Sequence, residues 1–147
     1  MLTKDFILAG KAIFTISNGR GQHFTFKVRK QESEQWDVKW FASVRTHQES
    51  RNYLYLGVVN SVSGVPHLTK ASKYPQDSQE YKVLRWALDI VWGRRTLPAG
   101  YKISHVGRCG RCGRTLTTPD SIRCGIGPEC RKDMGLLGLS TTPSLKA

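Results

Sequence analysis

The sequence has few cysteines and no long hydrophobic run. No stretch of its 147 residues is apolar over enough length to cross a bilayer. The opening segment, residues 1–14, lacks the pattern of a cleaved signal peptide. Its four cysteines all fall between positions 109 and 130, and structural disulfides are rare in reducing compartments. We therefore expect a cytoplasmic protein with free thiols and no membrane partner.

Acidic residues are scarce beside the basic ones. Asp and Glu number 11 against 23 Lys and Arg, which gives a formal net charge of +12. Such an excess favours polyanionic partners, nucleic acid first and acidic protein surfaces second. The alternative is that the charge serves solubility alone, and charge by itself does not distinguish DNA from RNA.

Catalytic motifs are also missing. We find no phosphate-binding glycine loop and no nucleophile motif. A zinc deaminase needs H-x-E and P-C-x-x-C; residues 47–49 fit the first half, but Arg108 rather than proline precedes Cys109. A treble-clef nuclease needs a histidine in its hairpin, and residues 113–129 contain none. We therefore expect no enzyme activity and no small-molecule substrate.

Hydrophobic alternation predicts four strands, and a later segment predicts one helix. The expected strands cover residues 11–17, 23–30, 36–46 and 53–60. A short edge strand near 67–69 is a further option. Residues 77–93 carry apolar side chains at helical spacing, with Asp77 or Ser78 as the N-cap. The pattern predicts an α+β domain over residues 1–100, in which an antiparallel sheet of about four strands packs against one helix.

The cysteines have the spacing of a structural zinc site. Cys109 and Cys112 form a C-x2-C pair, and Cys124 and Cys130 follow after a segment of hairpin length. Four soft thiolates in two local pairs suit tetrahedral zinc. Proline and glutamate just before Cys130 favour a helix that begins there. We expect a treble-clef-like or zinc-ribbon-like module over the segment that contains all four thiols.

The fourth zinc ligand is open to two assignments. Five residues separate Cys124 from Cys130, more than is usual in a paired motif. His105 lies four positions before Cys109 and is the alternative ligand to Cys124. We prefer four cysteines. The expected boundaries are 101–138 for the module and 139–147 for a flexible tail.

The motifs CGRCGRTL, P-x-S-I and GIGPEC resemble the C-terminal zinc-finger-like segment of a family of uncharacterised phage and prophage proteins. The likeness is specific over residues 105–131 and looser over 78–104. It implies a viral or prophage origin and a small zinc-binding module, without a known activity. The cysteines of CGRC and GPEC match the family motif, whereas Cys124 falls where relatives carry other residues, which keeps His105 as a candidate.

Basic residues crowd the expected module. They are Arg108, Arg111, Arg114, Arg123, Arg131 and Lys132. Arginines on a rigid scaffold contact phosphates, which favours affinity over sequence reading. We therefore expect a phage-type accessory protein that binds nucleic acid, DNA or RNA. The alternative is a module that docks on a host enzyme or defence complex and inhibits or redirects it.

The expected sheet carries basic and aromatic residues of its own. Lys27, Arg29 and Lys39 alternate with apolar positions and extend the basic surface. Four aromatic residues would stack on bases if exposed, although such residues are more often part of the core. They are Trp36, Trp40, Tyr53 and Tyr55.

Overall fold

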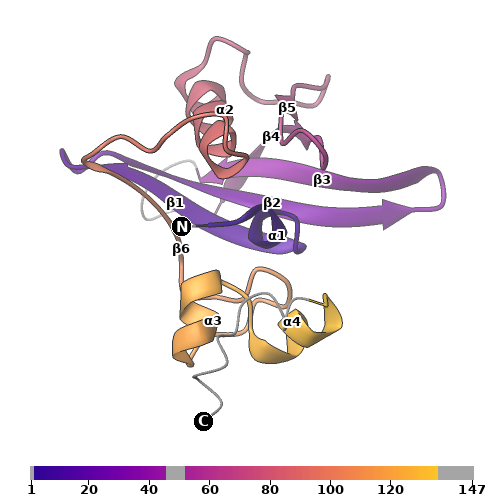
Figure 1. Cartoon of the computed structure of the whole chain (residues 1–147). Helices are drawn as coiled ribbons and strands as arrows, with labels where there is room; N and C mark the ends of the chain where they lie inside the picture. Colours follow the sequence, from indigo (N-terminus) through magenta and orange to yellow (C-terminus); the bar gives the residue numbers. More distant parts are fainter. Residues whose placement is uncertain (1, 46–51, 136–147) are drawn as a thin grey trace.

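The computed structural model describes residues 2–45 and 52–135, which form an antiparallel sheet, a covering helix and a small cysteine-bearing module (Figure 1). The strands are β1 (Lys11–Asn18), β2 (His23–Ser33), β3 (Trp36–Arg45), β4 (Tyr53–Val59), β5 (Pro66–His67) and β6 (Tyr101–His105). The helices are α1 (Lys4–Ile7), α2 (Gln79–Val91), α3 (Pro119–Cys124) and α4 (Pro128–Asp133). The α+β class is confirmed. The tail expected over 139–147 lies outside the described residues.

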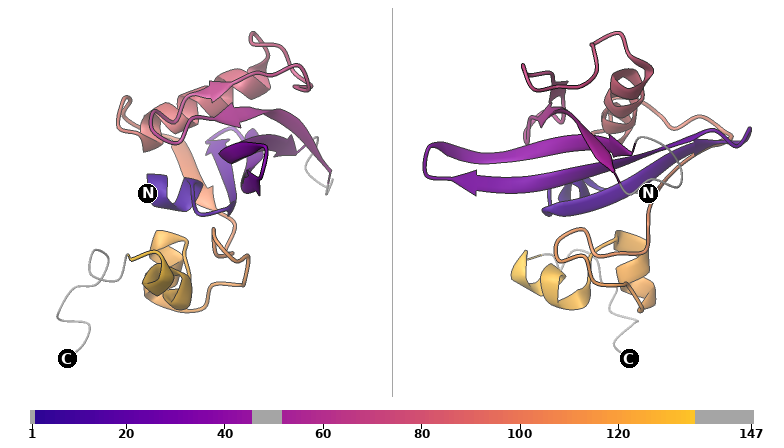
Figure 2. Two further views of the ribbon diagram at one scale, coloured as in Figure 1. Left: turned by 90° about the vertical axis from the view of Figure 1, so that its right-hand side faces the viewer. Right: turned by 180° about the vertical axis from the view of Figure 1, so that it is seen from behind.

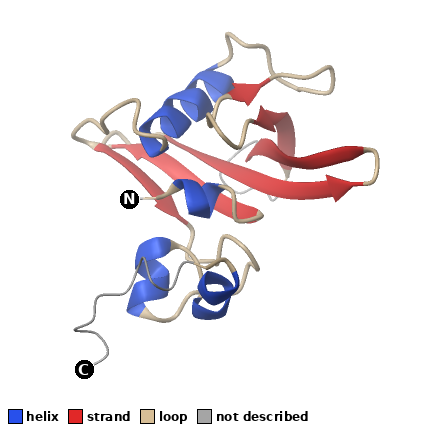
Figure 3. Ribbon diagram, turned by 45° about the vertical axis from the view of Figure 1, so that its right-hand side comes forward, coloured by secondary structure: helices blue, strands red, loops and turns tan. Residues whose placement is uncertain are grey.

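In the described part of the chain, the sheet contains six strands rather than the expected four or so. Their order is β5-β4-β3-β2-β1-β6, and each pair is antiparallel. The two further strands lie at the edges: β5 overlaps the optional edge strand near 67–69, and β6 was not expected. β5 is only two residues long, and β6 returns after α2 to pair with β1, with Ile16 opposite Ile103. The sheet therefore continues through His105, and the module follows directly after the end of β6 (Figure 3).

The core lies between α2 and one face of the sheet. Alternate residues of the strands point to this face and are buried: Ala12, Phe14, Ile16, Phe26, Val28, Ala42 and Val44. Leu84 and Leu88 of α2 are fully buried in the same cluster. Ser78 caps the helix, since its side chain accepts a hydrogen bond from the Tyr81 N–H at 3.2 Å. This capped, one-sided helix is the one that the hydrophobic spacing predicts.

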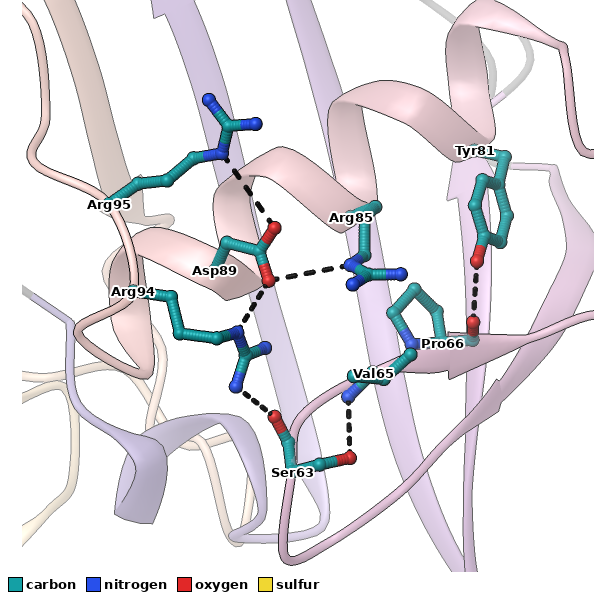
Figure 4. A network of polar contacts seen from close by, with 8 residues as sticks. All are labelled: Ser63, Val65, Pro66, Tyr81, Arg85, Asp89, Arg94 and Arg95. Carbon is teal, nitrogen blue, oxygen red and sulfur yellow. Dashed lines mark hydrogen bonds and ion pairs between the residues drawn. The ribbon is translucent and has the colours of Figure 1, made fainter.

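A buried carboxylate fixes the end of α2 against the neighbouring loop (Figure 4). Asp89 is 8% exposed and pairs with Arg94 at 2.8 Å and with Arg85 at 3.4 Å. Arg94 also donates to the carbonyl oxygen of Ser63 at 2.6 Å. Farther along the helix, the Tyr81 hydroxyl donates to the Pro66 carbonyl at 2.7 Å. Arg94 therefore has a structural role at this helix end.

The helix α2 has 13 residues and is the longest that the structure describes. Within the residues described, no helix combines the length and apolar character needed to cross a membrane.

Candidate metal centre and its basic surround

The first two cysteines lie on a tight turn formed by residues 108–115, here called the knuckle. The Cys109 N–H donates to the Arg114 carbonyl at 2.8 Å, and the Gly113 N–H donates to the Cys109 carbonyl at 2.9 Å. Arg108 and Thr115 form an isolated antiparallel bridge across its base. The knuckle thus brings Cys109 and Cys112 to one side of a closed backbone loop.

Two short helices complete the module. α3 begins after Thr118, whose hydroxyl accepts from the Ser121 N–H at 3.3 Å, and it ends at Gly125 with a left-handed φ of 76°. α4 begins at Pro128, and the expected helix start beside Cys130 is confirmed. The turn between the helices directs α4 toward the knuckle, so that the Cys130 thiol lies near Cys109 and Cys112.

Three sulfurs meet where the knuckle faces α4. The Sγ atoms of Cys109, Cys112 and Cys130 all lie within 4.8 Å of one another. Zinc–sulfur bonds of about 2.3 Å place two ligands of a tetrahedral ion about 3.8 Å apart, so small movements would let these sulfurs share one ion. Cys109 and Cys130 are buried, and Cys112 is exposed. The group fits a soft divalent metal.

The Cys109 thiol is prepared for the thiolate form that a metal requires. Burial raises its pKa, but N–H groups of Gly127, Cys112 and Arg111 donate to the sulfur and lower the pKa to about 7. The distances from Sγ to the Gly127 and Arg111 nitrogens are 3.3 and 3.4 Å. Backbone donors of this kind hold and orient the first ligand of a metal site.

The Cys130 thiol has the opposite tendency. Burial, hydrogen bonds to Cys112 and Cys109, and the charge on Cys109 raise its pKa to about 11. Cys109 therefore gives up its proton more readily than Cys130. A divalent cation compensates the repulsion among further thiolates, and its binding releases their protons.

The two candidates for a fourth ligand lie outside this group. The Cys124 thiol donates to the Ile126 carbonyl at 3.3 Å. The His105 ring is engaged on both sides: Nδ1 accepts from the Gly107 N–H at 2.8 Å, and Nε2 lies against the Ile122 carbonyl oxygen. Among the described residues, the structure thus brings together three of the predicted ligands and neither Cys124 nor His105.

The module is anchored on Phe6, which sequence reasoning did not single out. Phe6 is fully buried, and a Cβ at Gly110 or Gly125 would come within 2.7 or 2.6 Å of its ring. The Lys11 N–H at the start of β1 donates to the Gly110 carbonyl at 2.6 Å. Two glycines therefore let the backbone of the module approach α1 closely. The glycines next to the cysteines were the available signal, but nothing in the sequence identified their partner.

Most of the basic residues expected around the module are on its surface. Arg108, Arg111, Arg114, Arg123 and Lys132 are exposed. Arg111 pairs with Asp133 at 3.0 Å, and Arg123 pairs with Asp120. Arg131 is only 5% exposed, so its side chain contributes little to that surface.

A hollow of about 460 Å³ opens beside the three sulfurs. Arg111 and Arg114 line it, together with Glu129 and Asp133. Asp133 pairs with Arg111 at 3.0 Å. The arrangement presents cations beside three thiols whose spacing is compatible with a metal ion.

The comparisons with known proteins concern this module. The model of DUF6011, described as a family of unknown function, matches residues 104–135. No curated protein and no solved structure matches the chain. The match runs from the end of β6 through α4 and includes all three grouped cysteines. The C-terminal module is thus similar to an uncharacterised family, which agrees with the part of the resemblance that concerns an uncharacterised C-terminal module.

Proposed function

We propose that this chain is a phage-type accessory protein that binds zinc through its C-terminal module and binds nucleic acid through the basic surface around that site. One observation carries the proposal. Arg108, Arg114 and Lys132 are exposed around the three-sulfur group, and none of them forms an ion pair within the described ranges. We place this activity in the cytoplasm, where thiols stay reduced.

The metal has a structural role in this proposal. The module offers two short helices and few buried apolar side chains, so its own core contributes little stability. A zinc ion bound by Cys109, Cys112 and Cys130 would join the knuckle to α4, and such sites contribute on the order of 10 kcal/mol to folding. The knuckle would then hold its arginines at fixed positions.

The arginines contact phosphates rather than bases. A guanidinium donates two parallel hydrogen bonds to a phosphate, and these charge-assisted bonds are stronger than neutral ones. Contacts of this kind position a protein on nucleic acid without reading its sequence. We therefore expect affinity for many sequences, with a strong dependence on salt.

The double variant Arg108→Glu, Arg114→Glu tests the proposed surface. Two repulsive charges replace two phosphate contacts, so we expect affinity for a fluorescent oligonucleotide to fall roughly 10- to 100-fold. The matched control is Arg20→Glu, Lys82→Glu, which makes the same change in charge at two exposed positions away from the module. Metal analysis verifies that both variants keep the metal content of the wild type.

Equal losses in both double variants would contradict a localised surface, because overall charge alone would then explain binding. Absence of any binding by the wild type would reject the proposed function. A stoichiometric protein partner that persists after nuclease treatment of a host lysate would in that case favour the protein-docking alternative.

A further inference from the structure

The face of the sheet turned away from the core carries its own basic and aromatic surface. Lys27 and Arg29 alternate along β2 with the buried residues Phe26 and Val28, so they point away from the core. The same face continues across β3 and β4 and contains a hollow of about 530 Å³. Seen from behind, β2 and β3 lie in front of α1 (Figure 2, right).

Cations and aromatic rings interleave in this hollow, here called the sheet hollow. Its rings belong to Phe41, Tyr53 and Tyr55, and all three side chains are half-buried. Arg29 lies opposite Phe41 in the register of β2 and β3, and the Lys27 ammonium lies 5.0 Å from the centre of the Tyr53 ring. Among the described residues that line the hollow, none is Asp or Glu.

Three aromatic rings between the cations are unusual on the solvent-facing side of an antiparallel sheet. Such a side normally alternates polar residues with the buried ones, and the buried residues Phe14, Phe26 and Val28 face the opposite side. Within the described part of the chain, neither Lys27 nor Arg29 forms an ion pair. A surface that carries Lys27 and Arg29 without paired carboxylates in the described ranges is complementary to an anionic partner.

We propose that the sheet hollow binds single-stranded nucleic acid. Lys27 and Arg29 contact the phosphates, and bases stack on Tyr53, Tyr55 or Phe41. Base–aromatic stacking together with a basic groove is the common mode of single-strand binding. Duplex bases already stack on one another, so the rings favour an unpaired strand. An acidic polypeptide would satisfy the charges but would gain little from the three rings.

Lys11 lies between the sheet hollow and the knuckle. Lys11 lies opposite Arg29 at the end of the β1–β2 pair, and neighbours of this kind are about 5 Å apart. The Lys11 side chain in turn borders Gly113 of the knuckle, where a Cβ would lie 3.9 Å from it. One nucleic-acid strand could therefore contact both surfaces. The inference rests on the proposed function and specifies that the nucleic acid bound is single-stranded.

The variant Lys27→Gln, Arg29→Gln tests the inference, with Arg20→Gln, Lys82→Gln as the control of equal charge. Probes are a hairpin duplex and dT and U oligomers of about 16 nucleotides, the upper end of the length that one such binding site covers. We expect single-strand affinity to fall at least tenfold and the slope of log K against log salt to become shallower by about 1.4, for two lost contacts. Duplex affinity, carried by the module, should stay within about twofold.

A second measurement does not depend on variants. Oligonucleotides with 5-iodouracil cross-link to aromatic side chains on irradiation, and we expect adducts on the peptides that contain Phe41 or Tyr53 and Tyr55. Three binding results would overturn the inference: unchanged single-strand affinity in the variant, an equal loss of affinity for the duplex, or displacement of the probe by poly-glutamate as effective as displacement by dT. Cross-linked adducts confined to the module would overturn it as well. Failure of the wild type to bind either probe would instead reject the proposed function itself.

Discussion

Cys109→Ser should lower the zinc content of the purified chain from about one ion to nearly none. Cys109 is 1% exposed and lies within 4.8 Å of both other sulfurs. A serine hydroxyl is a harder and far less acidic ligand than a thiol, so it would not replace the thiolate. Loss of metal removes on the order of 10 kcal/mol of folding energy from the module. Elemental analysis measures the metal, and thiolate-to-cobalt absorption in the Co²⁺ form reports the sulfur ligands.

The matched control is Cys124→Ser. Its thiol bonds to a neighbouring carbonyl and lies outside the sulfur group, so we expect metal content and the cobalt spectrum to remain as in the wild type. If Cys124→Ser loses the metal as completely as Cys109→Ser, a four-cysteine site replaces the three-sulfur account. The variant His105→Ala tests whether His105 is the fourth ligand, again by metal content and the cobalt spectrum.

Phe6→Ala should destabilise the folded chain by about 3–5 kcal/mol, the usual cost of removing a buried aromatic ring. Phe6 is fully buried and lies under Gly110 and Gly125, both of which approach its ring too closely for a side chain. The resulting cavity would lie at the junction of α1 and the module. Urea unfolding gives the loss in free energy, and limited proteolysis shows whether cleavage concentrates beyond His105.

The control for this prediction is Ile122→Ala in α3. That side chain is 49% exposed, so its removal should cost less than about 1 kcal/mol. A cost for Phe6→Ala similar to that of Ile122→Ala would contradict the role of Phe6 as the anchor. Unchanged protease resistance of residues 106–135 would do so as well.

Local patterns in the sequence predict the elements that depend on local interactions. Alternation reveals four strands because each has one buried face, and the capped apolar stripe reveals α2. The knuckle and the start of α4 follow from C-x2-C and from the GPEC segment. These features need only neighbours within a few residues.

Long-range partners explain what the sequence did not reveal. β6 is a five-residue segment whose partner, β1, lies more than 80 residues earlier, so no nearby pattern indicates the pairing. The same holds for Phe6, which meets Gly110 and Gly125 only in three dimensions. For the metal site, spacing indicates four candidate thiols, but the hydrogen bond of Cys124 to the Ile126 carbonyl depends on how α3 ends.

The most direct test of the account is the binding of a dT oligomer by the zinc-loaded wild type at two salt concentrations. The proposed contacts are Arg108, Arg114 and Lys132 on the module with Lys27 and Arg29 on the sheet. For about five phosphates, the single-strand slope is about −3.5, so affinity should fall about 100-fold between about 50 and about 200 mM salt. An affinity that does not change over this range, or no binding at the lower salt, would contradict the account.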